Sequence, residues 1–295
     1  MRIGINTFLL TPGFSNNDIP ILKTIKDYGA DFVELAIVES EGFKTSEVRD
    51  ALDATGLDNP IVCGAWGPGR DLRGSPQEVS NSRDYLESLI KIAQDLGSDL
   101  ICGPFYSSGG RTEPYPEAVR EEQLDLISQS LRPLCEKAGD QGITLAFEPL
   151  NRFETDCINT VDQAIDLIDR VDHNALKIHI DTFHMHIEEN NSAEAIRRAG
   201  GHIGHVHASA SHRGILGKDQ IQWDQIIQAL VDIGYDRSVC IEAFSPEMAS
   251  LAKAASIWRK LYDSPQALAT EGIQFLKTKI SKAKETLHEN ARLSV

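Results

Sequence analysis

One pattern recurs along this 295-residue chain: a stretch with helical periodicity, then a glycine, then a short apolar run. Gly97, for example, follows an amphipathic stretch and precedes the run at residues 99–102. Glycine is common just past the end of a helix, where φ is positive. Apolar runs rich in β-branched residues are typical of strands buried on both faces. The alternation of helix and strand therefore predicts a parallel sheet covered by helices.

Eight such strands are expected, near residues 2–8, 31–36, 60–64, 99–103, 143–148, 176–181, 203–207 and 238–243. Eight strand–helix units in a chain of this length predict a closed α/β barrel, the (β/α)₈ or TIM barrel, for which about 250 residues is typical. We expect a single domain spanning residues 1–295, with an extra C-terminal helix from about Glu271 to Val295. An open, doubly wound sheet is the weaker alternative, because no Gly-rich phosphate-binding motif follows the first strand.

Composition excludes several classes of partner. The formal net charge of −15 disfavours nucleic acid and anionic membranes, which both require a basic surface. No run is long and apolar enough for a membrane span, and no leader segment is recognised at Met1. The five cysteines are odd in number and scattered, so we interpret Cys63, Cys102 and Cys240 as small core residues in a reducing cytoplasm.

Four of the expected strands finish in a residue that can bind a metal ion. These residues are Glu148, Asp181, His207 and Glu242. A buried charge at the end of an apolar run costs several kcal/mol unless it is paired or bound to a metal. The carboxyl ends of neighbouring parallel strands meet at the mouth of a barrel, where the active sites of such barrels lie. Three carboxylates and one imidazole suit Mn²⁺, Mg²⁺ or Co²⁺ better than a metal that prefers thiolates.

The competing interpretation is that these four residues act separately, capping helices or forming salt bridges. Four in consecutive strands make that the weaker hypothesis. Further polar residues follow the predicted ligands closely, among them Glu154, His184 and Arg213. They offer donors and acceptors suited to a polyol, although loops are polar in general.

The segments that carry these residues resemble the ketose 3-epimerases, a family of xylose-isomerase-like barrels that includes the D-tagatose, D-psicose (allulose) and L-ribulose 3-epimerases. The resemblance lies in Glu-Pro-Leu-Asn-Arg-Phe-Glu at 148–154, Asp-Thr-Phe-His-Met at 181–185, Gly-His-Val-His at 204–207 and Gly-Tyr-Asp with Ile-Glu at 234–242. The strand and glycine pattern extends it over nearly the whole chain. The loop at residues 209–212 departs from the family, being less acidic, and His186 stands where Asn is common.

The resemblance implies metal-dependent epimerisation of free ketoses at C3. It implies a metal, Mn²⁺ first and Co²⁺ or Mg²⁺ as alternatives, held by Glu148, Asp181, His207 and Glu242. Glu148 and Glu242 would also be the catalytic acid/base pair, and Glu154, His184 and Arg213 would contact substrate oxygens. A homodimer or homotetramer is implied as well.

The chemistry is consistent with this division of roles. Inverting a carbon next to a carbonyl requires removal of its proton on one face and return of a proton on the other, so two carboxylates must flank that carbon. A metal chelated by O2 and O3 would stabilise the cis-enediolate as a Lewis acid.

The remaining candidates are less specific. Trp66 is a possible wall against the sugar or an ordinary loop anchor. His179 and His205 are expected to pack and form hydrogen bonds below the metal, and Glu34 to line the floor of the site or pair with a lysine or arginine. His186 either tunes substrate choice or points outward, and the second interpretation is favoured.

Rival functions remain open. An aldose–ketose or hydroxypyruvate-type isomerase uses the same Glu-Asp-His-Glu site but moves the proton between C1 and C2, and an inosose dehydratase-like lyase also begins with an enediolate. An endonuclease-like phosphodiesterase is disfavoured by the charge of −15 and the single clear histidine ligand. A non-catalytic sugar or metal binder would have no need for two carboxylates beside one metal.

Overall fold

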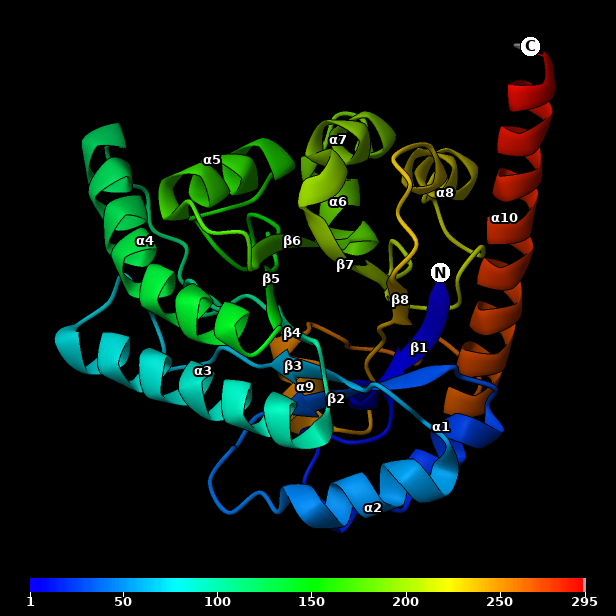
Figure 1. Cartoon of the computed structure of the whole chain (residues 1–295), viewed down its shortest axis with the longest axis horizontal. Coiled ribbons are helices and arrows are strands. Elements are labelled where there is room, and N and C mark those ends of the chain that lie inside the picture. The colour runs from blue at the N-terminus through cyan, green and yellow to red at the C-terminus, as the bar shows by residue number, and fades with distance from the viewer. Residues whose placement is uncertain (294–295) are drawn as a thin grey trace.

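The computed structural model describes residues 1–293, and its eight parallel strands close into a barrel (Figure 1). The strands are β1 (Arg2–Asn6), β2 (Phe32–Ile37), β3 (Ile61–Gly64), β4 (Leu100–Gly103), β5 (Thr144–Phe147), β6 (Leu176–Asp181), β7 (Ile203–Ala208) and β8 (Ser238–Ile241). Each strand pairs with the next along the chain, and β1 pairs with β8, with Ile3 opposite Val239. The predicted (β/α)₈ barrel is confirmed.

The helices surround the strands in Figure 1. They are α1 (Ile21–Asp27), α2 (Thr45–Thr55), α3 (Pro76–Leu96), α4 (Glu117–Asp140), α5 (Val161–Val171), α6 (Thr182–Glu188), α7 (Ser192–Ala199), α8 (Trp223–Asp232), α9 (Ala249–Ala254) and α10 (Pro265–Leu293). Gly97 ends α3 with a φ of 72°, as the helix–glycine–strand pattern predicts. Short 3₁₀ turns lie at Thr7–Leu9, Asn16–Asp18 and Gly200–His202.

Several boundaries differ from the sequence-based expectation by one or two residues or more, and a side-chain hydrogen bond explains two of them. β1 ends at Asn6 because the Asn6 side chain accepts a hydrogen bond from the amide of Phe8 and begins a 3₁₀ turn. The extra C-terminal helix is confirmed, but it starts at Pro265, because the Ser264 hydroxyl accepts from the amide of Ala267 at its first turn. α10 packs against α8 and β1, and the predicted tail beyond Leu293 lies outside the described residues.

Side chains alternate between the two faces of each strand. Along β2, Val33, Leu35 and Ile37 face the helices and belong to the large core between barrel and helices. Phe32 and Ala36 face the barrel interior and belong to a second cluster with Cys63, Cys102, Ala146 and Cys240. All five cysteines are buried and free, so the interpretation of Cys63, Cys102 and Cys240 as small core residues is confirmed.

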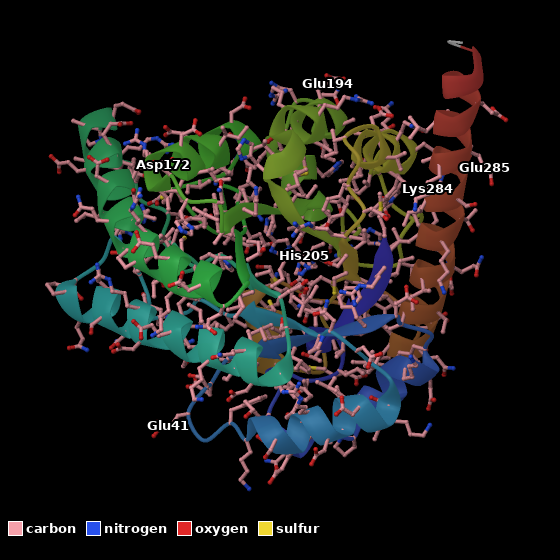
Figure 2. All side chains as sticks on the ribbon, viewed as in Figure 1. Glu41, Asp172, Glu194, His205, Lys284 and Glu285 are labelled. Atoms are coloured by element: carbon pink, nitrogen blue, oxygen red, sulfur yellow. The ribbon has the colours of Figure 1, made fainter. Side chains whose placement is uncertain are left out.

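Acidic side chains lie mainly on the outside of the molecule, and some polar residues lie inside the barrel. The acidic residues Glu41, Asp172 and Glu194 are exposed, and Glu41 and Glu194 lie at the outer edge in Figure 2, whereas His205 lies among the strands and is fully buried. Within residues 1–293, no helix combines the length and apolar character that crossing a membrane would require.

Candidate functional site

The four predicted ligands meet at the carboxyl end of the barrel. Glu148 follows β5 directly, Asp181 is the last residue of β6, His207 lies near the end of β7, and Glu242 follows β8 directly. All four are buried. Possible ligand atoms of Asp181, His207 and Glu242 lie within 4.8 Å of one another, and Glu148 forms equally close groups with His207 and with Asp181. The structure therefore brings the predicted set together.

Arg213 lies between two of these carboxylates. Its Nη1 donates to Asp181 Oδ2 at 2.7 Å, to Glu242 Oε2 at 2.8 Å and to Ser209 Oγ at 2.7 Å. Its guanidinium also stacks on the ring of Phe183, 3.9 Å from the centroid. The backbone of Arg213 has a φ of 62°, which residues other than glycine adopt rarely and which is found preferentially at functional sites.

His207 has one occupied and one free ring nitrogen. Its Nε2 lies 2.7 Å from Glu34 Oε1, while Nδ1 lies 3.5 Å from Glu242 Oε1 and has no hydrogen-bond partner among the described residues. An unpartnered, buried imidazole nitrogen that faces carboxylates is the arrangement expected of a metal ligand. The residues present therefore fit a divalent cation bound by oxygen and imidazole ligands.

The surroundings of Glu148 and Glu242 shift their pKa values in opposite directions. Burial raises the pKa of Glu148 well above its usual range, and the charge of Glu242 raises it further. Burial also raises the pKa of Glu242, but the charges of His207 and Arg213 outweigh that effect and hold it at about 2. The surroundings therefore favour the ionised form of Glu242 more strongly than that of Glu148.

His184 is held in a defined orientation. Its Nδ1 accepts from the backbone amide of Asn151 at 3.0 Å, so in the neutral ring the proton is on Nε2. Nε2 points into the site and lies 3.6 Å from Glu148 Oε1. Burial lowers the pKa of His184 well below its usual value, with a further contribution from the charge of Arg213, so the ring is a neutral donor.

Glu154 is half-buried, and its Oε1 accepts from Asn151 Nδ2 at 2.8 Å. Burial raises the pKa of Glu154, although the charge of Arg213 opposes this. Asn151 therefore contacts both Glu154 and His184, a role that was not predicted although Asn151 lies inside the motif at residues 148–154. Ser209, which contacts Arg213, was also missed, because it lies in the loop that departs from the family pattern.

Trp66 is buried and packs edge-on against Tyr85, with 5.1 Å between ring centroids. It also lines a cleft of about 830 Å³ next to the barrel mouth, together with Phe8 and Leu251. Both interpretations of Trp66, loop anchor and wall of the site, are therefore compatible with its position.

The residues below the candidate metal site agree only in part with the expectation. His205 is hydrogen-bonded to Ser238 and Glu34, whereas His179 packs against the ring of His207 and has no hydrogen-bond partner within the described part of the chain. Glu34 pairs with histidines rather than with lysine or arginine, so that alternative is wrong. His186 is exposed on α6, as predicted.

Comparison with known proteins gives consistent results. A family model described as xylose isomerase-like TIM barrel matches residues 22–279. A probable ketose 3-epimerase of Synechocystis sp. is 31% identical over 278 residues, which cover 94% of this chain and 96% of that protein. A D-psicose 3-epimerase of Enterocloster bolteae is 38% identical over 248 residues, 81% of each chain. A solved structure of an L-ribulose 3-epimerase has a TM-score of 0.91 and 29% identity, and 97% of each chain is covered.

Proposed function

Because the chain belongs to the xylose isomerase-like TIM barrels and, among them, to the ketose 3-epimerases, it is a carbohydrate epimerase, and we propose that it inverts C3 of free ketoses. One observation carries this proposal. Two buried carboxylates, Glu148 and Glu242, follow β5 and β8, and Asp181 and His207 lie on the strands between them. The names of the relatives, which specify psicose and ribulose, support a ketose as the substrate.

The two glutamates divide the proton transfer. One carboxylate removes the proton from C3, and the other returns a proton to the opposite face, which inverts the configuration. His184 Nε2 and the Arg213 guanidinium are preorganised donors at the same mouth and would bind the oxygens on which negative charge develops. Glu154 would bind a substrate hydroxyl, and Trp66 would form part of the wall of the site.

Glu148, Asp181, His207 and Glu242 would hold a divalent cation, with Mn²⁺ as the proposed ion. When bound, the cation supplies Lewis-acid stabilisation of the negative charge on the substrate oxygens. The free Nδ1 of His207 and the buried carboxylates around it support this ligand set. Burial of all four side chains keeps bulk water from competing for the same proton.

An isotope experiment tests the reaction. The Mn²⁺-loaded protein is incubated in deuterated water with D-psicose, D-tagatose and L-ribulose in turn, and NMR spectra are recorded after the metal is removed. We expect deuterium at C3 alone, together with the C3 epimer of one or more of these sugars. The same incubation with Glu242→Gln is the control and should give no C3 epimer.

Two results would contradict the proposal. Deuterium at C1 or C2 with an aldose product would identify an aldose–ketose isomerase. Absence of label with every ketose would leave a lyase or a sugar binder.

Assembly and location are further proposals that rest on the resemblance. The protein would act as a single-domain subunit of a homodimer or homotetramer in the cytoplasm. Light scattering coupled to size-exclusion chromatography measures the number of subunits directly.

A further inference from the structure

We propose that Glu34 is a positioning residue for the metal centre. It would hold the His207 ring so that Nδ1 faces the cation and Nε2 faces away from it. Glu34 lies on β2, across the barrel from His207 on β7, and both side chains are buried in the interior. The inference rests on the proposed metal site, but it concerns a residue outside the ligand set.

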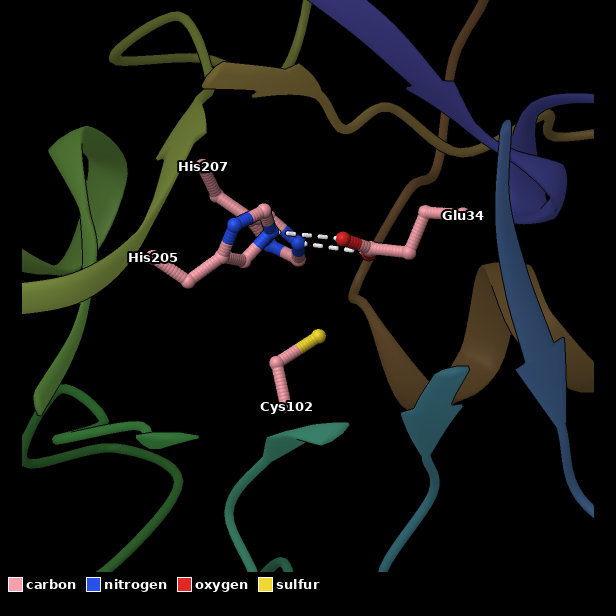
Figure 3. A group of neighbouring side chains, drawn as sticks. All are labelled: Glu34, Cys102, His205 and His207. Carbon is pink, nitrogen blue, oxygen red and sulfur yellow. Dashed lines mark hydrogen bonds and ion pairs between the residues drawn. The ribbon is translucent and has the colours of Figure 1, made fainter. Parts of the chain in front are cut away.

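Glu34 receives three donors. Its Oε1 lies 2.7 Å from His207 Nε2 and 2.6 Å from Asn6 Nδ2, and its Oε2 lies 2.6 Å from His205 Nε2. Figure 3 shows both imidazole rings directed at the one carboxylate. The orientation of the Asn6 amide is fixed independently, because its Oδ1 accepts from the amide of Phe8 at 2.8 Å. The amide group of Asn6 therefore donates to Glu34.

This arrangement determines the tautomers of both histidines. An ionised carboxylate only accepts hydrogen bonds, so each ring that points Nε2 at Glu34 carries a proton on that nitrogen. The Nδ1 of His205 is then an acceptor, and the Ser238 hydroxyl lies 2.9 Å away as its donor. In the neutral ring, the Nδ1 of His207 is then left with a lone pair beside Glu242. One assignment thus satisfies the whole network and leaves the metal-facing nitrogen ready to bind.

A second metal site in this cluster is the competing hypothesis, because Glu34, Cys102, His205 and His207 also lie close together. Two ligand atoms bound to one zinc ion in a tetrahedral site are roughly 3.3 Å apart. The contacts of 2.6 Å and 2.7 Å between Glu34 and the two rings are shorter than that and are typical of charge-assisted hydrogen bonds. The distances therefore favour a hydrogen-bonded support over a metal site.

Glu34 would orient the His207 ring and raise the basicity of its Nδ1. A carboxylate that accepts the distal N–H of a ligating imidazole fixes the ring and makes its other nitrogen a stronger ligand. Removal of such a partner weakens metal affinity by about 10- to 100-fold in other proteins. We expect the same range here.

The test compares three forms of the full-length protein after treatment with a chelator: the parent, Glu34→Gln and Glu34→Met. Mn²⁺ binding is measured by isothermal titration calorimetry, and folding by circular dichroism. Glu34→Gln keeps an acceptor for His207 but loses the charge, so the dissociation constant should rise by about 10-fold. Glu34→Met removes the acceptor as well, and the dissociation constant should rise by about 100-fold.

Cys102→Ala is the matched control. Cys102 lies beside Glu34, His205 and His207 in the barrel interior, and it forms no hydrogen bond to them in the described residues (Figure 3). Truncating it loosens the same part of the core without removing the support of His207. The Mn²⁺ dissociation constant of this variant should equal that of the parent. If Cys102→Ala weakened binding as much as Glu34→Gln, general loosening of the core would account for both, and the inference would fail.

A measurement on the parent keeps the inference testable if a Glu34 variant does not fold. With diamagnetic Zn²⁺ bound, ¹⁵N NMR of the histidine rings should place the His207 proton on Nε2. A proton on Nδ1, or unchanged Mn²⁺ affinity in a folded Glu34→Met variant, would overturn the role of Glu34 alone. Failure of the parent to bind any divalent cation would overturn the metal centre and this inference together.

Discussion

Glu148 and Glu242 occupy equivalent places in the chain, each one residue beyond the end of a strand. That position places both buried side chains at the mouth of the barrel. It was predictable, because a charge at the end of a buried apolar run is costly unless a partner or a metal ion compensates it. The same reasoning predicted that Asp181 and His207 would lie beside them, and the structure places them there.

Replacement of either glutamate by glutamine should abolish turnover. Glutamine keeps the size of the side chain but can neither remove nor return the C3 proton, so kcat should fall by about 10³-fold or more in each variant. Steady-state kinetics measure the loss, and circular dichroism should show an unchanged fold. Glu247→Gln is the control, because Glu247 is exposed in the loop after Glu242. Turnover near the parent rate in Glu148→Gln or Glu242→Gln would rule out a two-base mechanism.

Other contacts at this scale were not predictable. The partners of Glu34 are His205 and His207, more than a hundred residues away along the chain, and only the closure of the barrel brings β2 and β7 face to face. Arg213 was expected to contact substrate, but the direction of its side chain depends on a backbone φ of 62° in a loop. An arginine gives no local signal for that conformation, which glycine, asparagine and aspartate adopt more often.

The strands themselves were predicted to within about two residues, because each is a short β-branched run bounded by polar residues. The ends were less well predicted than the centres. Asn6 shortens β1 through a side-chain hydrogen bond, and Ser264 starts α10 earlier than the apolar pattern indicates. In both cases a single polar side chain competes with the regular backbone pattern.

The close approach of β4 to β3 at Gly103 should be essential for the stability of the barrel. A Cβ added to Gly103, at the end of β4, would lie 2.3 Å from the carbonyl oxygen of Gly64 on β3, and the φ of Gly103 is 135°. Gly103→Ala should therefore lower the free energy of unfolding by about 3 kcal/mol, from overlap and backbone strain together. Urea denaturation measures this change.

The control for this prediction is Gly29→Ala. Gly29 has a φ of 91°, but nothing lies within 4 Å of an added Cβ, so only backbone strain of about 1 kcal/mol is expected. Equal losses in the two variants would show that the contact between β3 and β4 is unimportant. Gly103 also matters for the site, because its carbonyl accepts from the amide of Glu148 at 3.1 Å.

At the scale of the whole molecule, the alternation of helix and strand was sufficient to predict the barrel, because few architectures accommodate eight parallel units. The site followed from the fold, since the barrel brings the ends of all eight strands to one mouth. The pairing of Glu34 with His205 and His207 beneath the mouth did not follow, because it depends on side chains that face one another across the interior.

A metal bound at this mouth should stabilise the entire barrel, since its ligands come from four neighbouring strands. At a free Mn²⁺ concentration of 100 times the dissociation constant, linkage gives about 2.7 kcal/mol, or a rise in Tm of about 5 °C. Differential scanning calorimetry with and without chelator measures the rise. Asp181→Asn is the control, because asparagine can still cap α6 at the amide of Phe183 but is a poorer ligand. An unchanged Tm with Mn²⁺, Co²⁺ and Mg²⁺ would contradict the metal site.

The pairing of β1 with β8 has a consequence for synthesis on the ribosome. The first strand to emerge is among the last to gain its second neighbour, so until β8 has been translated the nascent sheet keeps two open edges. Such edges can pair with other chains, which makes premature termination or stalling before Ser238 hazardous. Truncated products of this protein should therefore depend on chaperones far more than the finished chain does.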